Sequence, residues 1–492
     1  MISKSTFQNY MQCPKLCWLS IHKPGEAEPP ARDNRANGIL VGELAKTYFL
    51  GTADCTRLDA AGKPLYAEQI AATKAALLGG AEAIAEAAFS VGGLYCAVDI
   101  LKRDVNAFSI YEVKSALTVK EKYLTDVAFQ KYVLEQAGAT VEHIYIMHPD
   151  KQYALHGALD VRQYFAAECV DVNKTVTRCL DELPALLPEI EKTIAAGTEP
   201  AMDFCRACKD CPFNRYCTRD IPEDCVGSLS GIGEKAYDYY NKGILTIADY
   251  AKTKEYAKST RRARIQAEKV LAQDDTVYVD KTALKEFLDR IEYPVYHLDF
   301  ETTQKPIPEF EGFHPDESYP FQYSLHIEAA DGTLNHREFL GDEENCVRAL
   351  AEQLVRDIPA GSRLMAYNAS TEKNIIKDLA RRFPDLAPQL LELSSGFIDL
   401  LEPFKKGYYY DPKQKGSNSI KEVMPALCPA MAEAYHRLPV VHNGYEALSM
   451  FPRLIALKGM PEYAAVRKGM LAYCELDTRS MVEILKVLRA AI

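Results

Sequence analysis

The residues with the clearest chemical potential are a group of cysteines near position 210. Four thiols lie within thirteen residues of the chain: Cys205, Cys208, Cys211 and Cys217. The C-x2-C spacing of Cys208 and Cys211 allows both sulfurs to reach one metal centre from a tight turn. Cys13 precedes a proline, as Cys211 does, and is the best candidate for a fourth ligand from elsewhere. Four cysteines can hold Zn²⁺ or an iron–sulfur cluster, and reduced thiols without a metal are the alternative.

A second group combines acidic and basic side chains at strand spacing. Residues 94–99 and 107–114 are predicted to form two strands joined by a turn. Glu112 and Lys114 are two residues apart and therefore point to the same face, and Asp99 at the end of the partner strand can join them. Two carboxylates and a lysine around one point can hold a divalent cation and an activated water. A surface ion pair between the strands is the alternative.

A third group of acidic residues is spread over the C-terminal part of the chain. Asp299 and Glu301 end a predicted buried strand and share one of its faces. Glu372 is expected near the start of a helix that follows a short apolar strand. Tyr473 and Asp477 are spaced i, i+4, which puts them on one face of a helix. Each piece alone also fits a helix cap or a solvated surface pair.

The composition limits the class of protein. The chain has 492 residues, of which 48% are hydrophobic and 26% charged, which is enough for two or three domains with full cores. The net charge of −11 argues against a histone-like partner, but metal-dependent nucleases also concentrate carboxylates in their sites. Fourteen cysteines without a secretory segment favour reduced thiols and metal binding. We therefore expect a cytoplasmic protein that does not enter a membrane.

The elements that position these residues mix helices and strands. Two early helices are predicted, over residues 38–50, which include Glu43, and over residues 68–90. In the C-terminal part, strands that alternate with helices predict an α/β sheet with both faces covered. The expected domains are residues 1–220, 221–290 and 291–492.

The middle domain is expected to be a helical connector. Gly231 and Gly233 lie in a Gly-Ile-Gly turn that looks like a helix-hairpin-helix, whose backbone N–H groups can meet a phosphate. The segment that follows is locally basic: Lys254, Lys258, Arg261, Arg262, Arg264 and Lys269. A nucleic acid can lie along such a segment, and a plain linker with a solvated basic face is the alternative.

The N-terminal residues resemble a known nuclease family. Between the cysteines the chain carries, in this order, Asp99, Glu112, Lys114 and Gln130. This pattern resembles the PD-(D/E)XK nucleases of the RecB type, and the resemblance covers about residues 1–220. It implies a restriction-endonuclease fold with a divalent metal ion at the acidic residues. That family often has a histidine ligand on its first helix, and here either Glu43 substitutes for it or the site lacks this ligand.

The cysteines resemble those of one branch of the same family. In its iron–sulfur branch, one cysteine precedes the nuclease core and three follow it with spacings of two and five residues. The chain matches this pattern at Cys13, Cys208, Cys211 and Cys217. The resemblance implies a 4Fe–4S cluster that staples the fold, with zinc as the alternative. Cys205 and Cys17 are spare thiols that can replace a ligand.

The C-terminal residues resemble a second nuclease family. Their order along the chain is Asp299, Glu301, Glu372, Tyr473 and Asp477. It resembles the DnaQ-like DEDD exonucleases of the tyrosine type, over residues 293–490, although Glu372 stands where that family has Asp. The resemblance implies an RNase H-like fold in which four carboxylates hold two Mg²⁺ or Mn²⁺ ions and the tyrosine orients or helps to deprotonate the attacking water.

The two resemblances together predict a DNA nuclease with two catalytic centres. They imply a 3′–5′ exonuclease that processes DNA ends, with single-stranded ends or flaps as substrate, in repair or in defence against foreign DNA. Three alternatives stay open. One is an RNA-trimming exonuclease, one is a nucleic-acid-binding scaffold with one or both centres inactive, and one is a zinc-stapled interaction module.

Overall fold

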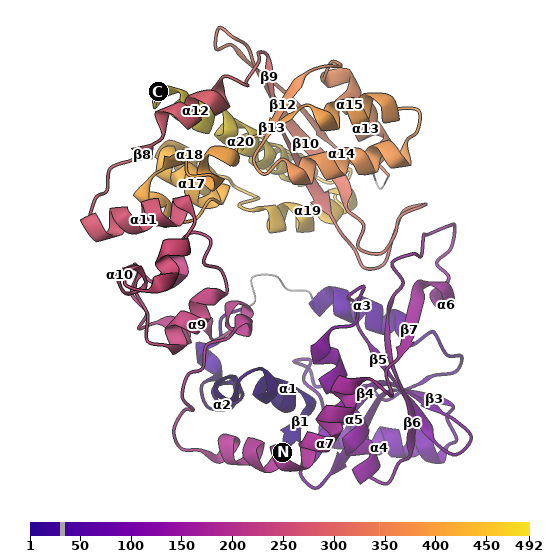
Figure 1. Ribbon diagram of the computed structural model, residues 1–492. Helices are drawn as coiled ribbons and strands as arrows, with labels where there is room; N and C mark the ends of the chain where they lie inside the picture. The colour runs from indigo at the N-terminus through magenta and orange to yellow at the C-terminus, as the bar shows by residue number, and fades with distance from the viewer. Residues whose placement is uncertain (30–34, 344) are drawn as a thin grey trace. The chain divides into compact units, whose positions relative to one another are not determined.

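The chain folds into two compact units. The computed structural model describes residues 1–29, 35–343 and 345–492 (Figure 1). The first unit comprises residues 1–220 and 305–317, and the second comprises residues 221–304 and 318–492. Residues 221–290, expected to form a connector, therefore lie inside the second unit.

The first unit is built on one mixed sheet. Its strands follow the order β2-β3-β4-β5-β6-β7, and β1 pairs with β4 in parallel. The pairs β3–β4, β4–β5 and β6–β7 are antiparallel, whereas β2–β3 and β5–β6 are parallel. The bounds are β1 (Ile2–Ser3), β2 (Ala53–Asp54), β3 (Ala83–Val91), β4 (Leu94–Arg103), β5 (Phe108–Val113), β6 (Val141–Pro149) and β7 (Phe165–Cys169).

Helices of the first unit cover this sheet because their apolar faces need burial. Phe7 of α1 stacks on Phe129 of α5 with ring centroids 4.8 Å apart, in a core that also holds Val127 and Val133. Helix α7 packs against α5 and buries Val176, Cys179, Leu183 and Ile190. The helices are α1 (Lys4–Gln12), α2 (Pro14–His22), α3 (Arg35–Ala45), α4 (Tyr66–Leu78), α5 (Glu121–Gln136), α6 (Val161–Tyr164), α7 (Lys174–Ala195) and α8 (Asn214–Thr218), with 3₁₀ turns at Pro24–Glu26 and Arg206–Asp210.

The predicted helix over residues 68–90 is wrong in its second half. The helix α4 ends at Leu78, before Gly79 and Gly80, and residues Ala83–Val91 form strand β3. The alanine-rich composition of this stretch favours a helix locally. Pairing along the length of β4 and burial in the core outweigh that preference, because β propensity depends mainly on packing.

The second unit is built on a five-stranded sheet. The order is β11-β10-β9-β12-β13, in which β9, β10 and β11 are antiparallel neighbours and β12 and β13 run parallel to β9. The strands are β9 (Val295–Thr303), β10 (Tyr319–Glu328), β11 (Leu334–Leu340), β12 (Arg363–Ala366) and β13 (Phe397–Asp399), with a separate pair of β8 (Tyr278–Val279) and β14 (Tyr409–Tyr410). The general prediction of an α/β architecture, with helices and strands mixed in each unit, is confirmed.

Helices of the second unit pack along the sheet. The long α20 runs against β9 and β10, and α13 and α14 also pack on this sheet. The helices are α9 (Lys235–Asn241), α10 (Ile247–Ala251), α11 (Arg261–Ala272), α12 (Lys281–Leu288), α13 (Val347–Asp357), α14 (Ser370–Arg382), α15 (Ala387–Ser395), α16 (Glu402–Lys405), α17 (Ile420–Leu427), α18 (Pro429–His436), α19 (Gly444–Ala456) and α20 (Tyr463–Ala490), with 3₁₀ turns at Val226–Ser228, Lys254–Lys258 and Pro412–Gln414.

The link between β9 and β10 belongs to the first unit. Its residues 305–317 bond to the backbone around Leu155, with Gly312 N donating to Leu155 O at 2.7 Å and Leu155 N donating to Phe313 O at 3.0 Å. Tyr164 Oη donates to Pro306 O at 3.0 Å. The chain therefore leaves the second unit directly after one of its central strands and returns before the next.

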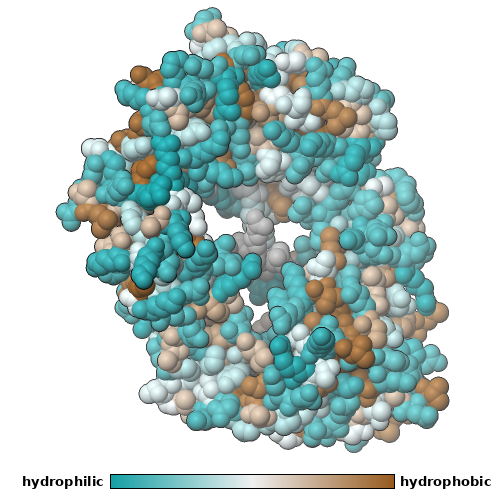
Figure 2. All heavy atoms as spheres, in the orientation of Figure 1, coloured by the Kyte–Doolittle hydropathy of each residue, from teal (hydrophilic) through white to brown (hydrophobic). Residues whose placement is uncertain are grey.

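Hydrophilic residues cover most of the face drawn in Figure 2. Among the described residues, no helix combines the length and the apolar character that crossing a membrane requires.

Candidate active sites and a candidate metal centre

The first candidate site is centred on Glu112 at the end of β5. Its carboxylate is completely buried. Lys114 forms an ion pair with Glu112, and Nζ of Lys4 from α1 lies 3.0 Å from its Oε1. Gln130 of α5 donates to Glu112 Oε2 at 2.7 Å. Strand β5 and helix α5 thus bring three of the sequence-predicted residues to one point.

Asp99 joins this group from β4. Its Oδ2 accepts a hydrogen bond from the backbone N–H of Val113 at 2.7 Å. Burial, reinforced by the charge of Glu112, raises the pKa of Asp99 to about 7. For Glu112 burial acts in the same direction, but the ammonium groups of Lys114 and Lys4 hold its pKa below the usual range. Neighbouring carboxylates with opposite pKa shifts are typical of functional sites.

Two further members of the site were not predicted from the sequence. Asp126 lies 3.1 Å from Lys114 and 3.7 Å from Lys4, measured from its Oδ2 to each Nζ. Asp126 precedes Gln130 by four residues on α5, so the i, i+4 spacing is a local signal that could have identified it. For Lys4 no local signal exists, because the pairing of β1 with β4 brings it here.

Glu86 is a third residue that the sequence prediction missed. Ala85 and Ala87 pair with Ile100 and Val98, so Glu86 on β3 is level with Asp99. Its φ is 53°, an uncommon value for a residue with a side chain. Burial raises the pKa of Glu86, and the charges of Lys4 and Glu112 act on it. It was missed because β3 was predicted to be helical.

Glu43 does not join the site, contrary to the prediction. Its side chain on α3 is 62% exposed and forms an ion pair with Lys46 at 2.7 Å. Lys46 also binds Asp54 of β2 at 2.8 Å. Because its carboxylate is exposed, Glu43 is not one of the buried carboxylates, and Glu86, on which the charge of Lys46 also acts, supplies the additional one.

The first site has an excess of negative charge that suits a divalent cation. Among the described residues, Lys4 and Lys114 oppose its four carboxylates, and Lys46 also acts on Glu86 through its charge, so the carboxylates outnumber the ammonium groups. Carboxylate oxygens are the ligands that Mg²⁺ and Mn²⁺ prefer. The donor set therefore fits such an ion, which Asp99 and Glu112 would hold with Glu86 or Asp126 next to them.

The cysteines gather around one pocket of the first unit. Its lining includes five thiols, from Cys13, Cys205, Cys208, Cys211 and Cys217. Cys13 is the residue between α1 and α2, and the others follow α7, so the fold unites segments almost 200 positions apart. The lining is otherwise mainly apolar, including Leu16, Leu19 and Phe213. Four or five thiols facing one cavity fit a metal or cluster site.

The two spare thiols have different surroundings. Cys17 is buried in the main core of the unit near Phe7, and it does not line the pocket. Burial raises its pKa to about 11, as in a structural thiol. Cys205 does line the pocket, with its Sγ 3.9 Å from that of Cys208. Only Cys205 is therefore placed to exchange with a ligand.

The second candidate site consists of buried carboxylates on β9, α14 and α20. Asp299 and Glu301 lie on β9, and Glu372 and Asp477 come from the two helices. Burial and then the charges of the other carboxylates, Asp477 first, raise the pKa of Asp299 well above its usual value. Among the described residues, no lysine or arginine forms an ion pair with any of the four. Lys421 acts on Asp477 through its charge alone, so the mutual repulsion of the four carboxylates is offset only in part.

Two tyrosines donate hydrogen bonds to Asp477. Tyr435 of α18 donates to Asp477 Oδ1 at 2.6 Å, and Tyr473, one turn earlier on α20, also donates to this carboxylate. Burial raises the pKa of Asp477 to about 6, although these two hydrogen bonds oppose the rise. The charge of Glu301 also acts on the Tyr473 hydroxyl, whose pKa burial and the neighbouring carboxylates raise. The sequence did not predict Tyr435 as a member of the site, because no local pattern links it to Asp477, 42 positions away.

Glu372 is held at the first turn of α14. Burial, aided by the nearby charge of Asp399, raises its pKa to about 7, and its Oε2 has no hydrogen-bond partner among the described residues. Asp399 accepts the backbone N–H of Asn368 at 2.9 Å, which helps to fix Asn368 at a φ of 67° before the helix. An unpartnered buried carboxylate oxygen is costly, so this atom is a natural ligand for a cation.

Cys474 completes the second site. Its Sγ lies within 4.8 Å of ligand oxygens of Asp299 and Glu301. Burial and the surrounding carboxylates raise the pKa of this thiol, so it is a neutral neighbour in the metal-free protein.

The basic segment after the Gly-Ile-Gly turn is largely engaged within the second unit. Arg262 is buried and donates to Gly416 O at 2.9 Å. Arg261 pairs with Asp280, and Lys269 with Asp274. These three side chains are therefore engaged within the unit, whereas Lys254, Lys258 and Arg264 are exposed, and contact with a nucleic acid stays a prediction. Gly231 and Gly233 do have positive φ, at 76° and 55°, as a tight turn requires.

Part of the second unit matches a model of a protein family. Residues 296–419 match a family model described as "Domain of unknown function (DUF2779)". The matched segment contains Asp299, Glu301 and Glu372, and it ends before α20. No curated protein matches the chain.

Proposed function

We propose that the protein is a metal-dependent nuclease with two catalytic centres, of which the second is a 3′–5′ exonuclease acting on DNA ends. The observation that carries this proposal is the convergence of Asp299, Glu301, Glu372 and Asp477, none of which forms an ion pair with a lysine or arginine among the described residues. Such a group is unfavourable in isolation, since like charges at close range oppose joint ionisation. Two divalent cations would remove the repulsion.

The sheet of the second unit supports the DnaQ-like interpretation. The order β11-β10-β9-β12-β13, antiparallel over three strands and then parallel, is the arrangement expected of an RNase H-like fold. Asp299 and Glu301 on the central β9 are also where that fold would carry its first acidic pair. This support is by analogy of fold, and the chemistry rests on the carboxylates themselves.

The first unit supports the RecB-like interpretation in the same way. Its succession of α4, three antiparallel strands, α5 and a parallel β6 is that expected of a restriction-endonuclease core. Asp99, Glu112 and Lys114 share one point of it. The pocket that joins Cys13 to the later cysteines fits the proposed 4Fe–4S staple.

The order of the cysteines along the chain is the argument for a cluster over zinc. One cysteine, Cys13, precedes the core, and Cys208, Cys211 and Cys217 follow it with the spacings of the iron–sulfur branch. The donor set by itself suits either group, since four cysteines can hold Zn²⁺ or a 4Fe–4S cluster.

Each side chain of the second site has a defined task in this proposal. Asp299, Glu301, Glu372 and Asp477 would hold two Mg²⁺ or Mn²⁺ ions, which supply water activation and stabilisation of the leaving 3′ oxygen. Tyr473, whose hydroxyl bonds to Asp477 and senses the charge of Glu301, would orient the attacking water. Tyr435 holds Asp477 in place.

The test is a digestion of end-labelled single-stranded DNA with Mn²⁺. With a 5′ label, wild-type protein should give a ladder of products shortened from the 3′ end. Asp299→Ala should abolish this ladder, whereas Glu112→Ala should leave it and remove only the products of the first centre. A ladder that survives Asp299→Ala refutes the assignment of the second centre. The same assay on RNA decides whether the protein is an RNA-trimming enzyme instead.

A further inference from the structure

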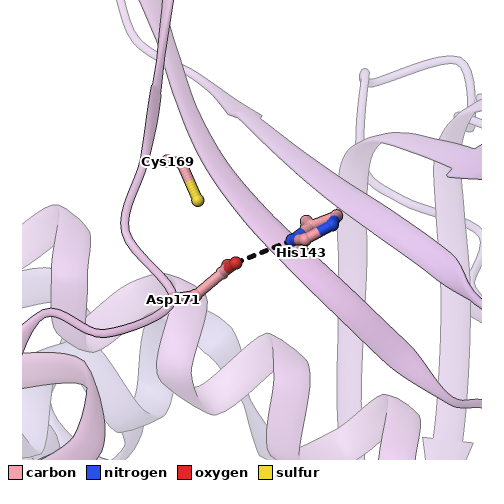
Figure 3. Close-up of side chains that lie close together, drawn as sticks. All are labelled: His143, Cys169 and Asp171. Carbon is pink, nitrogen blue, oxygen red and sulfur yellow. Dashed lines mark hydrogen bonds and ion pairs between the residues drawn. The ribbon is translucent and has the colours of Figure 1, made fainter.

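A second group of metal-ligand side chains lies on the sheet of the first unit, at His143, Cys169 and Asp171. Figure 3 shows that they converge from β6, from the end of β7 and from the segment that follows it. His143 Nδ1 and Asp171 Oδ2 are 2.7 Å apart. One ligand atom from each of the three residues lies within 4.8 Å of the other two.

The backbone holds these side chains in place. Cys169 pairs with Tyr145 in the β6–β7 ladder, and Val170 N donates to Ile144 O at 2.9 Å. Asp171 Oδ1 accepts the N–H of Ile144 at 2.6 Å, which leaves Oδ2 directed at His143. The arrangement is therefore built on paired strands.

The group is distinct from the first candidate active site. In the parallel β5–β6 pair, His143 is level with Ser109, whereas Glu112 is level with Ile146. It lies toward the start of β6, and the carboxylates lie toward its end. The side chains of His143 and Asp171 are 43% and 23% exposed, and Cys169 is exposed, so an ion from solvent can reach them.

In the metal-free protein, the His143–Asp171 ion pair and a hydrogen bond between Cys169 and Asp171 hold the three side chains together. A set of one imidazole nitrogen, one thiolate and one carboxylate oxygen suits Zn²⁺, which accepts all three donor types at tetrahedral spacing. It does not suit Mg²⁺, which prefers oxygen ligands. We propose that His143 Nδ1, Cys169 Sγ and Asp171 Oδ2 form a Zn²⁺ site whose fourth position is open to solvent.

Binding at this site converts the Cys169 thiol to a thiolate and releases its proton to solvent. The reactivity of Cys169 toward a maleimide therefore reports on occupancy. The experiment labels the whole protein anaerobically with N-ethylmaleimide, with and without Zn²⁺, and measures each cysteine by peptide mass spectrometry. Cys225 is the internal control, since it is a partly exposed thiol in the second unit.

At a Zn²⁺ concentration about ten times the dissociation constant, labelling of Cys169 should slow about tenfold, because only the free form reacts. The rate at Cys225 should stay unchanged, and Mg²⁺ should not protect Cys169. His143→Ala and Asp171→Asn should abolish the protection. The Asp171→Asn variant keeps an oxygen for the N–H of Ile144, so it guards against simple misfolding. Absence of protection, or equal protection in both variants, overturns the proposal.

Cobalt gives a second readout that does not depend on labelling. Co²⁺ added to wild-type protein should produce a thiolate-to-metal charge-transfer band that is missing in Cys169→Ser. The difference spectrum of these two proteins cancels any contribution of the cysteine pocket. An identical spectrum for both proteins contradicts the site.

Discussion

Nζ of Lys4 lies 3.0 Å from Oε1 of Glu112, although 108 positions separate the two residues. Lys4 is the first residue of α1, directly after the strand β1 that pairs with β4. The same helix ends at Cys13, which lines the cysteine pocket. One helix of nine residues therefore joins the first candidate active site to the candidate cluster.

The first prediction concerns Lys4. We expect Lys4→Met to lower the nuclease rate proposed for the first centre by on the order of 10²-fold, because it removes one of the two ammonium groups that pair with Glu112. The rate is measured on DNA in an Asp299→Asn background, which silences the second centre. Lys122→Met is the matched control, since Lys122 is exposed. An unchanged rate in Lys4→Met excludes a catalytic role for this residue.

The second prediction uses the link through α1. Cys13→Ser should remove the visible absorbance of anaerobically purified protein, because the proposed cluster loses one ligand. The rate of the first centre should fall, since α1 then holds Lys4 less firmly, whereas the 3′–5′ ladder from the second centre should persist. Cys225→Ser should change neither property. Colourless wild-type protein that contains stoichiometric zinc would show that the pocket is a zinc site.

The third prediction concerns the repulsion in the second site. Asp299→Asn removes one of four buried carboxylates, so it should raise the unfolding temperature of the metal-free protein. A relief of about 1 kcal/mol corresponds to roughly 2–4 °C for a unit of this size. The same variant should lose the stabilisation that Mn²⁺ gives to wild-type protein. Differential scanning calorimetry with and without Mn²⁺ measures both effects, with Asp289→Asn at an exposed position as control.

The fourth prediction is a pH dependence from Glu372. Its folded pKa is raised to about 7 from an ordinary value of 4.5, so the ionised form destabilises the folded state. The cost is fully present above about pH 7 and disappears as the pH falls toward 4.5. Its full size is about 3 kcal/mol. Without metal, Glu372→Gln should therefore be more stable than wild type at pH 8 and similar to it at pH 4.5, as measured by urea denaturation. Equal differences at both pH values would contradict the burial of an ionisable Glu372.

Local patterns in the sequence were sufficient for the strands and helices that carry most of the candidate residues. Glu112 and Lys114 share a face because the period of a strand is two, and Tyr473 and Asp477 share one because a helix turns every 3.6 residues. Asp299 and Glu301 follow from the same rule. Whether two such side chains share a face depends only on the local strand or helix geometry, so it does not depend on how the rest of the chain folds.

Only the tertiary structure decided which of these faces meet and which other residues join them. Lys4 reaches Glu112 through a parallel strand pair, and Tyr435 reaches Asp477 from a separate helix. Glu86 lies in an alanine-rich stretch that the sequence predicts as helix but that forms a strand paired with β4. Glu43, which was predicted to be a ligand, has an exposed side chain. Contacts of this kind depend on the packing of distant segments, and no periodicity along the chain encodes which distant segments will pack together.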